Sequence, residues 1–591
     1  MEFERRLKII LFFFVSIFAL LWVRLFYLQV MQGEILGKLA EANRTAILFE
    51  VAPRGLILDC AGTILADSVP TFVVLFSSLG LDEDDLPAIV QRLSKILQIP
   101  EEKLIARLRQ ALGRGTPVRL LDRASASVAF ALAEQRPNLP GISVITEMKR
   151  RYPNGDNAAH VLGYVGPMTL KEFQQSRSSR HERDWLVGKM GLEKIYDSIL
   201  RGEAGGMRIE VDAAGHSVKT LDKKEPVSGY RINTTINLKI QKVAEEALAE
   251  SGHSGAVVAI DPRNGEILAL VSAPAFDPNA FLYNRQEKEE NQVTPMDFLL
   301  HGDLPLFNRA AQGTYAPGSI FKIVVAAAAL ESGKINPLDK IYCPGHFAIP
   351  SKEKKLVYCW KRDGHGAVNL MEAMAGSCNV YFYNIGLKIG PDAIETMARN
   401  FGLGERTSLH FQNEKKGFVP GRSMFRTALR HWYDGDTVNL AIGQGRVLLT
   451  PIQAAQMISL VASRGVVYKL HMVKSIYSPS GELVESDFSG VERRVDLSPR
   501  TWDFLEKALT GVVETGTAKN SKIAGITIAG KTGTVQNPQG KDHAWAVCYA
   551  PVENPRIALS VIVEHGEKGS AAAMPIAKKI LETALADLIC R

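Results

Sequence analysis

The sequence APGSIFKIVVAAAALESG, residues 316–333, decides both the fold and the chemistry expected of this chain. Pro317 and Gly318 mark a turn, and the alanine-rich run after them predicts a buried helix. Ser319 therefore lies at a helix N-terminus, where the helix dipole favours developing negative charge. Lys322 follows one turn later on the same face. A serine hydroxyl needs a base to become a nucleophile, and a lysine with a depressed pKa can serve as that base.

Two further motifs follow this segment. Ser377-Cys378-Asn379 has the pattern SxN, and Lys531-Thr532-Gly533-Thr534 has the pattern KTGT. An SxxK pattern alone is a weak signal, because the chain repeats it at Ser351–Lys354 in a lysine-rich run that is typical of a solvated surface. The three motifs in this order strongly favour acyl transfer through a serine nucleophile.

Each motif supplies a group that acyl transfer requires. Ser377 offers a hydroxyl for proton relay, and Asn379 offers an amide for a substrate carbonyl. Lys531 is a cation for a substrate carboxylate, and the glycine of its motif lets a substrate backbone approach as an added strand. The backbone N–H groups of Ser319 and Thr534 are candidates for an oxyanion hole.

An apolar run near the N-terminus predicts a single membrane anchor. Residues 9–23 read IILFFFVSIFALLWV, and the apolar character continues past Arg24 to Met31. About 20 helical residues span a bilayer core. Because basic residues precede the run, we expect the N-terminus in the cytoplasm and the chain after about residue 31 outside the cytoplasmic (inner) membrane. The alternative is a cleaved signal peptide, but no small-x-small cleavage pattern follows the run.

Length and pattern divide the chain into three predicted parts. The 591 residues exceed the size of one core. We predict an anchor at 1–31, a mixed α+β spacer domain, here called the pedestal, at 32–230, and a catalytic domain at 231–591. In the pedestal, residues 86–112 have helical spacing interrupted at Pro100.

The pattern within residues 231–591 predicts an α/β sandwich. Strand-like segments lie near both ends of this part: at 255–273, with Asn264-Gly265 as a hairpin turn, and at 525–530, just before KTGT, 544–550 and 556–565. About 250 mostly helical residues separate them, which indicates a sheet built from both ends and covered by helices. The net charge of +7 indicates solubility and weak attraction to anionic surfaces, and no nucleic-acid-binding motif is present.

With its three motifs, the chain resembles the penicillin-recognising serine transferases, whose signature is SxxK, SxN and KTG. The resemblance implies a D,D-transpeptidase acting on D-Ala-D-Ala stem peptides of peptidoglycan, inhibited by β-lactams, with possible carboxypeptidase side activity. The resemblance implies that Ser319 is the nucleophile and Lys322 is its base. It implies that Ser377 relays protons and that the amide of Asn379 positions the donor peptide. The carboxylate of a D-alanine or a β-lactam would be bound by Lys531, Thr532, Gly533 and Thr534.

Longer segments are similar to the elongation-type class B penicillin-binding proteins, the penicillin-binding protein 2 family. VAPRGLILDCAGTILA (51–66) looks like the segment PRGxIxDRxGxxLA, with Cys60 in place of the usual arginine. HAWAVCYAP (543–551) looks like HAWFxGFAP, with alanine and cysteine in place of phenylalanine and glycine. The motif GHG at 364–366 also favours the elongation branch over the division-specific branch.

Four residues form the pattern C-x15-C-x5-H-x12-C: Cys343, Cys359, His365 and Cys378. Three thiols and an imidazole suit a closed tetrahedral Zn²⁺ site, and the family resemblance implies structural zinc in this region. A Cys343–Cys359 disulfide is an alternative outside the cytoplasm, as are free thiols with a hydrogen-bonded His365. No organic cofactor is expected.

Other functions remain open on sequence alone. A β-lactamase would need a deacylating water and base, usually in a soluble chain of about half this length. A β-lactam sensor would need a cytoplasmic signalling domain, and only about eight residues precede the apolar run. An inactive scaffold is disfavoured by the intact motifs. The family resemblance implies a membrane-embedded partner, a SEDS-family glycosyltransferase, bound through the anchor and the pedestal.

Overall fold

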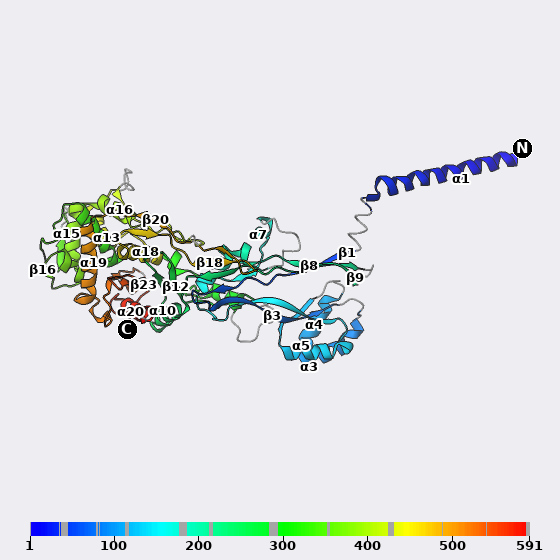
Figure 1. Ribbon diagram of the computed structural model, residues 1–591, viewed down its shortest axis with the longest axis horizontal. Coiled ribbons are helices and arrows are strands. Elements are labelled where there is room, and N and C mark those ends of the chain that lie inside the picture. The colour runs from blue at the N-terminus through cyan, green and yellow to red at the C-terminus, as the bar shows by residue number, and fades with distance from the viewer. Residues whose placement is uncertain are drawn as a thin grey trace.

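The molecule is elongated, with the N-terminal helix at one end and the C-terminal half of the chain at the other (Figure 1). The structure is a computed structural model. The second SxxK pattern, Ser351–Lys354, lies outside the described residues. The described residues are 2–34, 36, 45–77, 81, 83–112, 118–175, 186–211, 217–282, 294–350, 355–409, 411–422, 431–486, 488–538 and 540–586.

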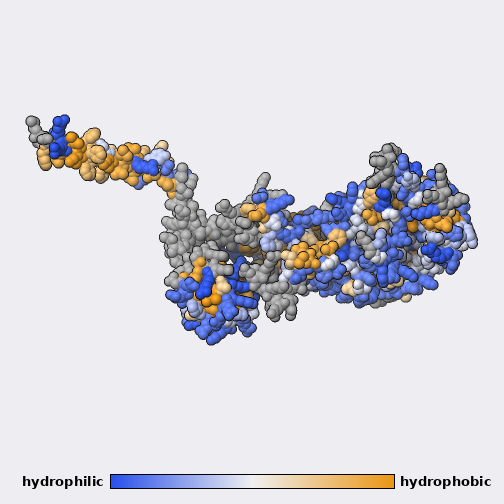
Figure 2. Space-filling model, turned by 180° about the vertical axis from the view of Figure 1, so that it is seen from behind, coloured by the Kyte–Doolittle hydropathy of each residue, from blue (hydrophilic) through white to orange (hydrophobic). Residues whose placement is uncertain are grey.

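A long helix begins the chain. α1 (Glu2–Phe26) continues into a short π-helix, η1 (Tyr27–Met31). Its apolar side chains are exposed along its length, as the orange surface in Figure 2 shows. Such exposure is unfavourable in water and favourable in lipid, where the helix satisfies its own backbone groups. The helix from Arg5 to Met31 is long and apolar enough to cross a membrane, as the sequence predicted.

The pedestal combines sheets with a group of helices. Helices form over residues 86–97 and 101–111, and Pro100 separates them as predicted. The elements are β1 (Thr45–Glu50), β2 (Ile57–Leu58), β3 (Ile64–Phe76), α3 (Leu86–Leu97), α4 (Glu101–Ala111), β4 (Val118–Ala124), α5 (Ala126–Glu134), β5 (Ile142–Arg151), α6 (Ala159–Leu162), β6 (Val165–Pro167), α7 (Leu170–Gln175), β7 (Leu186–Gly188), α8 (Gly191–Ile195), α9 (Asp197–Leu200), β8 (Gly205–Val211) and β9 (Ser217–Lys224).

One sheet joins the pedestal to the C-terminal half. Its order is β19-β18-β10-β2-β3-β4, and β5 also pairs with β3. β10 (Arg231–Thr234) runs parallel to β2 and antiparallel to β18 (Val473–Tyr477). Strands more than 200 residues apart in sequence therefore lie side by side, and the two halves share backbone hydrogen bonds. The predicted boundary at residue 230 falls next to this sheet and stays a prediction.

A buried ionic network lies at the neck of the pedestal. The carboxylate of Glu193 is fully buried and accepts hydrogen bonds from Arg54 Nε at 2.5 Å and Arg150 Nε at 2.6 Å. Asp197 accepts a further bond from Arg54 Nη2 at 2.8 Å. Removing one partner would leave a buried charge uncompensated, at a cost of about 3–5 kcal/mol. The network therefore fixes three separate segments against one another.

The C-terminal half contains a five-stranded antiparallel sheet in the order β12-β11-β23-β22-β21. Strands from both ends of this half form it, as predicted: β11 (Gly255–Ile260), β12 (Ile267–Ala273), β21 (Ala529–Val535), β22 (His543–Ala550) and β23 (Ile557–Val563). Alternate residues of β11 enter two different cores. Helices therefore cover both faces of the sheet, which confirms the α/β sandwich.

The two helical layers have different sources. α10 (Leu238–Glu250) and α20 (Ala573–Ala584) cover one face, and the insertion between β12 and β21 covers the other. The elements of the insertion are α11 (Pro295–Leu300), α12 (Arg309–Gln312), α13 (Lys322–Glu331), β13 (Ile341–Cys343), β14 (His346–Ala348), β15 (Leu356–Tyr358), β16 (Gly366–Val368), α14 (Leu370–Ala375), α15 (Asn379–Ile389), α16 (Pro391–Asn400), α17 (Asp434–Ala441), α18 (Pro451–Ala462), β17 (Val466–Tyr468), β18, β19 (Leu483–Glu485), β20 (Val491–Arg494) and α19 (Pro499–Glu514).

The structure corrects one detail of the last strands. The sequence placed a strand at 525–530 with the KTGT motif after it. β21 instead runs from Ala529 through the whole motif, because all seven of its residues pair with β22. The motif therefore belongs to the sheet, and its backbone is held straight by the neighbouring strand.

Candidate active site

The segment before Ser319 lies against β21. Ser319 belongs to a 3₁₀ turn over residues 318–321 that leads directly into α13, and it is half-buried. A Cβ on Gly533 would lie 3.1 Å from the carbonyl oxygen of Pro317, and one on Gly318 would lie 2.9 Å from that of Thr534. Glycine at these two positions lets the nucleophile turn and the KTGT strand approach each other closely.

Three of the predicted catalytic side chains, those of Lys322, Lys531 and Ser377 itself, meet at the hydroxyl of Ser377, and Asn379 is hydrogen-bonded to Lys322. Lys322 Nζ lies 3.2 Å from Ser377 Oγ and donates to Asn379 Oδ1 at 2.7 Å. Lys531 Nζ donates to the same Ser377 Oγ at 3.0 Å. The hydrogen bonds among the described residues do not include one from the Ser319 hydroxyl. The structure thus brings together one residue from each of the three motifs and places Ser319 one turn before Lys322.

Burial changes the electrostatics of both lysines. Lys322 and Lys531 are fully buried. Loss of hydration lowers the pKa of Lys322 to about 8, although the neighbouring thiols of Cys359 and Cys378 oppose that shift. Burial, together with the charge of Lys322, also holds the pKa of Lys531 well below its ordinary value. A neutral amine next to Ser319 is therefore accessible near neutral pH, as a general base requires.

Ser377 has a strained backbone. Its φ is +53°, a left-handed conformation that residues with a side chain rarely adopt. Its N–H donates to the carbonyl of Met374 at 3.3 Å, and the N–H of Cys378 donates to Ala373 at 2.9 Å. These bonds to α14 hold the turn that points the Ser377 hydroxyl between the two lysines. Sequence spacing gave no sign of this conformation.

Among the strands of the described residues, β21 is the last of its sheet, so its edge on the side away from β22 has no strand partner there. An extended substrate can pair with such an edge. Of the predicted binding residues, Thr534 is exposed and Gly533 buried, while the Thr532 hydroxyl lies 2.9 Å from that of Thr517. Sequence reasoning missed Thr517, which belongs to no recognisable motif.

Side chains far from the motifs hold the segment before the nucleophile. The hydroxyl of Tyr315 donates to Glu564 Oε1 at 2.6 Å, and Arg309 Nε reaches the same oxygen at 3.1 Å. The indole N–H of Trp545 donates to the carbonyl of Ala316 at 3.1 Å. Sequence reasoning missed these contacts, although Trp545 belongs to the segment HAWAVCYAP that it had singled out. Together they fix the backbone just before Ser319.

The loop after α17 contacts both sides of the site. The carbonyl of Gly443 accepts from the N–H of Gly318 at 2.8 Å. Gln444 Nε2 lies 3.5 Å from the carbonyl oxygen of Thr534. The loop thus touches Gly318, which precedes Ser319, and Thr534, the last residue of KTGT. The predicted oxyanion donors are the N–H groups of Ser319 and Thr534.

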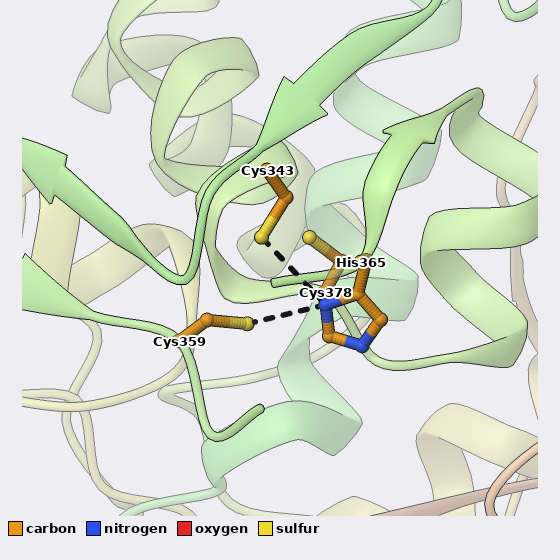
Figure 3. Close-up of side chains that lie close together, drawn as sticks. All are labelled: Cys343, Cys359, His365 and Cys378. Carbon is orange, nitrogen blue, oxygen red and sulfur yellow. Dashed lines mark hydrogen bonds between the residues drawn. The ribbon is translucent and has the colours of Figure 1, made fainter. Parts of the chain in front are cut away.

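The four predicted metal ligands lie together behind the SxN turn (Figure 3). The sulfur atoms of Cys343, Cys359 and Cys378 and a ring nitrogen of His365 all lie within 4.8 Å of one another. His365 Nδ1 is 3.7 Å from Cys343 Sγ and 3.5 Å from Cys359 Sγ. Cys343 and Cys359 are free thiols, with no disulfide between them.

The surroundings of this cluster suit a cation. His365 Nε2 lies 3.1 Å from the carbonyl of Gly376, so an N–H at that position leaves a lone pair on Nδ1, which faces the cysteines. A hydrogen bond from the Cys378 thiol lowers the pKa of Cys359. Zinc binds thiolate sulfur and neutral imidazole nitrogen, so the donor set fits Zn²⁺.

Comparisons with known proteins agree with this geometry. The transpeptidase domain of penicillin-binding proteins matches residues 255–582, and their dimerisation domain matches residues 49–234. The chain is 32% identical to the peptidoglycan D,D-transpeptidase MrdA of Acinetobacter baumannii, over 94% of this chain and 84% of that protein. It is 29% identical to MrdA of Haemophilus influenzae, over 98% and 91% of the two chains.

Among solved structures, the complex of penicillin-binding protein 2 with MreC from Helicobacter pylori matches with a TM-score of 0.76, at 28% identity over 92% of this chain and 99% of that one. A peptidoglycan synthase complex matches with a TM-score of 0.74, at 30% identity over 98% of both chains. The sheet, the three motifs and the strained serine turn define a serine acyltransferase of the penicillin-recognising class. The chain belongs to the penicillin-binding proteins, in the elongation-type class B group.

Proposed function

We propose that this protein cross-links peptidoglycan during cell elongation through an acyl-enzyme on Ser319. Ser319 Oγ attacks the carbonyl carbon of the penultimate D-alanine of a stem peptide, and the bond to the terminal D-alanine breaks. The serine proton passes to the leaving amine. An amine of a neighbouring strand then attacks the ester, the ester bond breaks, and a proton returns to Ser319.

The observation that carries this proposal is the meeting of Lys322 and Lys531 at Ser377 Oγ, with Asn379 hydrogen-bonded to Lys322. Lys322 acts as base for Ser319, and Ser377 relays protons between the two lysines. Lys531 with the hydroxyls of Thr532 and Thr534 binds the terminal carboxylate, while a stem peptide pairs with the edge of β21.

Labelling with a fluorescent penicillin tests the nucleophile. We expect a stable adduct that peptide mapping places on Ser319 and that is absent from Ser319→Ala. An adduct on another residue would contradict the assignment. Rapid drug hydrolysis without an adduct would favour a β-lactamase instead. A carboxypeptidase side activity predicts release of D-alanine from a pentapeptide when no acceptor amine is present.

We also propose that the cysteine cluster holds one structural Zn²⁺. The ligands would be the sulfur atoms of Cys343, Cys359 and Cys378 and Nδ1 of His365. The metal would contribute a fixed tetrahedral anchor at the residue between Ser377 and Asn379, and so hold the SxN turn in place.

Metal analysis of the purified protein tests this site. We expect about one zinc per chain, lost in Cys343→Ser, together with a lower Tm after chelation. Cys60→Ser is the matched control, because Cys60 is exposed and lies outside the cluster. A zinc-free protein whose Tm and penicillin acylation do not change on adding zinc would contradict the proposal.

The membrane arrangement is the third part of the proposal. The positive residues before α1 support a cytoplasmic N-terminus with the pedestal and catalytic half outside the inner membrane. Two of the solved structures named above are a complex with MreC and a peptidoglycan synthase complex, which supports partners in the elongation machinery. The family resemblance further implies that one partner is a SEDS-family glycosyltransferase. Labelling of single cysteines placed before and after α1 in intact cells tests the orientation.

A further inference from the structure

The hairpins that carry the cysteine cluster have two different faces. Along β15 and the residues after it, Val357 and Cys359 point inward, whereas Leu356, Tyr358 and Trp360 point outward. This alternation is that of an extended strand. The outward aromatic side chains are 50% exposed at Tyr358 and 59% at Trp360, and Leu356 beside them is 48% exposed. We call Leu356, Tyr358 and Trp360, which alternate on the outer side of this segment, the aromatic face.

Specific contacts hold these aromatic rings in place. The indole N–H of Trp360 donates to the carbonyl of Gly376 at 3.1 Å, and its ring meets the His365 ring edge-on at 5.5 Å. The guanidinium of Arg362 lies 4.2 Å from the centre of the Tyr358 ring. Aromatic rings that are both ordered and exposed lose little entropy when they bind a ligand, and rigid tyrosine and tryptophan side chains are typical of binding surfaces.

The surface around the aromatic face is positively charged. The described residues from 334 to 368 include five basic and two acidic side chains, which gives a net charge of +3. All seven of these side chains are exposed. The basic residues are Lys334, Lys340, Lys355, Lys361 and Arg362, and the acidic ones are Asp339 and Asp363. A ligand for this surface is therefore expected to combine anionic groups with flat apolar surfaces.

The aromatic face borders the catalytic site. Gly376, which holds Trp360, directly precedes Ser377. The hydroxyl of Tyr383 donates to the carbonyl of Tyr358 at 3.3 Å, and the same side chain is hydrogen-bonded to Asn379. A ligand on this face would thus lie next to the SxN turn.

We propose that the aromatic face is a docking surface for a peptidoglycan strand, which it guides to the acyl-enzyme. This inference rests on the proposed function. Sugar rings have apolar faces that stack on exposed aromatic rings, and stem peptides carry free carboxylates that pair with Lys361 and Arg362. Both parts of the strand therefore find a complementary group on this surface, and charge complementarity selects it over a neutral partner.

Strand binding to the full-length protein in detergent tests the inference. The probe is a soluble, uncross-linked glycan strand bearing stem peptides, added to the Ser319→Ala protein so that no turnover occurs. We expect Leu356→Ser with Tyr358→Ser to weaken binding about tenfold. Phe130→Ser is the matched control, because Phe130 is 69% exposed on α5 of the pedestal, and it should leave binding unchanged.

A second pair of variants tests the charge contribution without removing a ring. Lys355→Glu with Lys361→Glu should weaken binding of peptide-bearing strands and leave binding of peptide-free glycan unchanged. Free stem peptide should bind more weakly than the strand. If both pairs of variants bind the strand like the parent, or if the parent does not bind it, the inference is wrong.

Penicillin acylation keeps this test separate from that of the proposed function. In protein that retains Ser319, all of these variants should be acylated at the parent rate. Loss of strand binding with unchanged acylation supports the docking surface. Failure of the parent itself to form the Ser319 adduct would instead contradict the proposed function.

Discussion

Two lysine side chains contact one serine hydroxyl in this site, and the repulsion between their charges affects which of them is neutral. Lys322 and Lys531 are fully buried, and both reach Ser377 Oγ. Two buried ammonium groups this close repel each other strongly, so one of them tends to be neutral. A substrate carboxylate on Lys531 would stabilise its charge and leave Lys322 as the neutral base. Substrate binding would thus prepare the nucleophile.

The hydroxyl of Tyr315 is predicted to position Ser319. Tyr315→Phe keeps the ring but removes the 2.6 Å hydrogen bond to Glu564, which keeps Arg309 as its partner. A bond of this kind contributes about 1–2 kcal/mol. We expect the rate of penicillin acylation to fall about tenfold with little change in Tm. Stopped-flow labelling measures the rate.

A tyrosine elsewhere provides the comparison. Tyr164→Phe alters a half-buried ring that stacks on Phe281 at a centroid distance of 3.7 Å in the pedestal junction, and it should leave acylation unchanged. Tyr315→Phe combined with Glu564→Ala should be no slower than the slower single variant, because one change removes the donor and the other the acceptor of the same bond. Fully additive losses would show that the two residues act independently.

The loop after α17 is predicted to be intolerant of even one methyl group. Gly443 has a φ of +70°, and a Cβ there would lie 2.2 Å from the carbonyl oxygen of Gly318. Gly443→Ala should therefore displace the turn that carries Ser319 and lower acylation about 100-fold, the effect of a displacement of about 1 Å. Rates of penicillin labelling and circular dichroism of the purified variant provide the measurement.

Gly333→Ala serves as a control that distinguishes the steric clash expected in Gly443→Ala from the effect of backbone strain alone. Gly333 has a φ of +65° at the end of α13, and a Cβ there would meet nothing within 4 Å. Gly333→Ala should thus cost about 1–2 kcal/mol of stability and leave the acylation rate unchanged. Equal losses of activity in the two variants would mean that strain, and not contact with Gly318, explains the effect.

The sequence predicted those helices and strands whose ends are set by residues close by in the chain. Asn264-Gly265 specified a hairpin, and Pro100 separated two helices, because turn geometry and missing donors act over a few residues. The order of the motifs likewise identified the residues that meet at Ser377. Pairing across long distances was not predictable, since the 231–234 strand finds partners near residues 57 and 475 only in the folded chain.

Within the site, sequence reasoning found the reacting groups but not their supports. The motifs name Lys322 and Lys531 because their chemistry requires amines. Glu564 supports Tyr315 across 249 residues of sequence, and no spacing rule connects such a pair. The left-handed backbone of Ser377 depends on bonds to α14 and could not be read from its residue type.

Side chains at one junction couple the pedestal to the catalytic half. The amide of Asn279 binds both the N–H and the carbonyl of Tyr152, at 3.0 and 2.9 Å. Glu245 on α10 accepts from the N–H of Ala158 at 2.8 Å, while its second oxygen is buried without a partner. A force on the pedestal would therefore reach α10 and the loop after β12 directly, through these hydrogen bonds between side chains and the backbone.

Glu245 makes the stability of this junction dependent on pH. Burial raises its pKa from 4.5 to about 7, with hydrogen bonds from Ala158 and Gln241 opposing the shift. Between these two values the folded chain binds more protons than the unfolded chain. The contribution to stability is therefore complete below about pH 4.5 and is lost as pH rises to about 7, by up to roughly 3 kcal/mol.

Glu245→Gln removes the titrating group but keeps an acceptor for Ala158. The variant should show a smaller fall in Tm between pH 5 and pH 8 than the parent. The Tm of the variant minus that of the parent should therefore be larger at pH 8 than at pH 5. Glu246→Gln is the control, since Glu246 is exposed on the same helix. Parallel Tm curves for parent and Glu245→Gln would mean that this carboxyl stays charged in the fold and does not make the junction sensitive to pH.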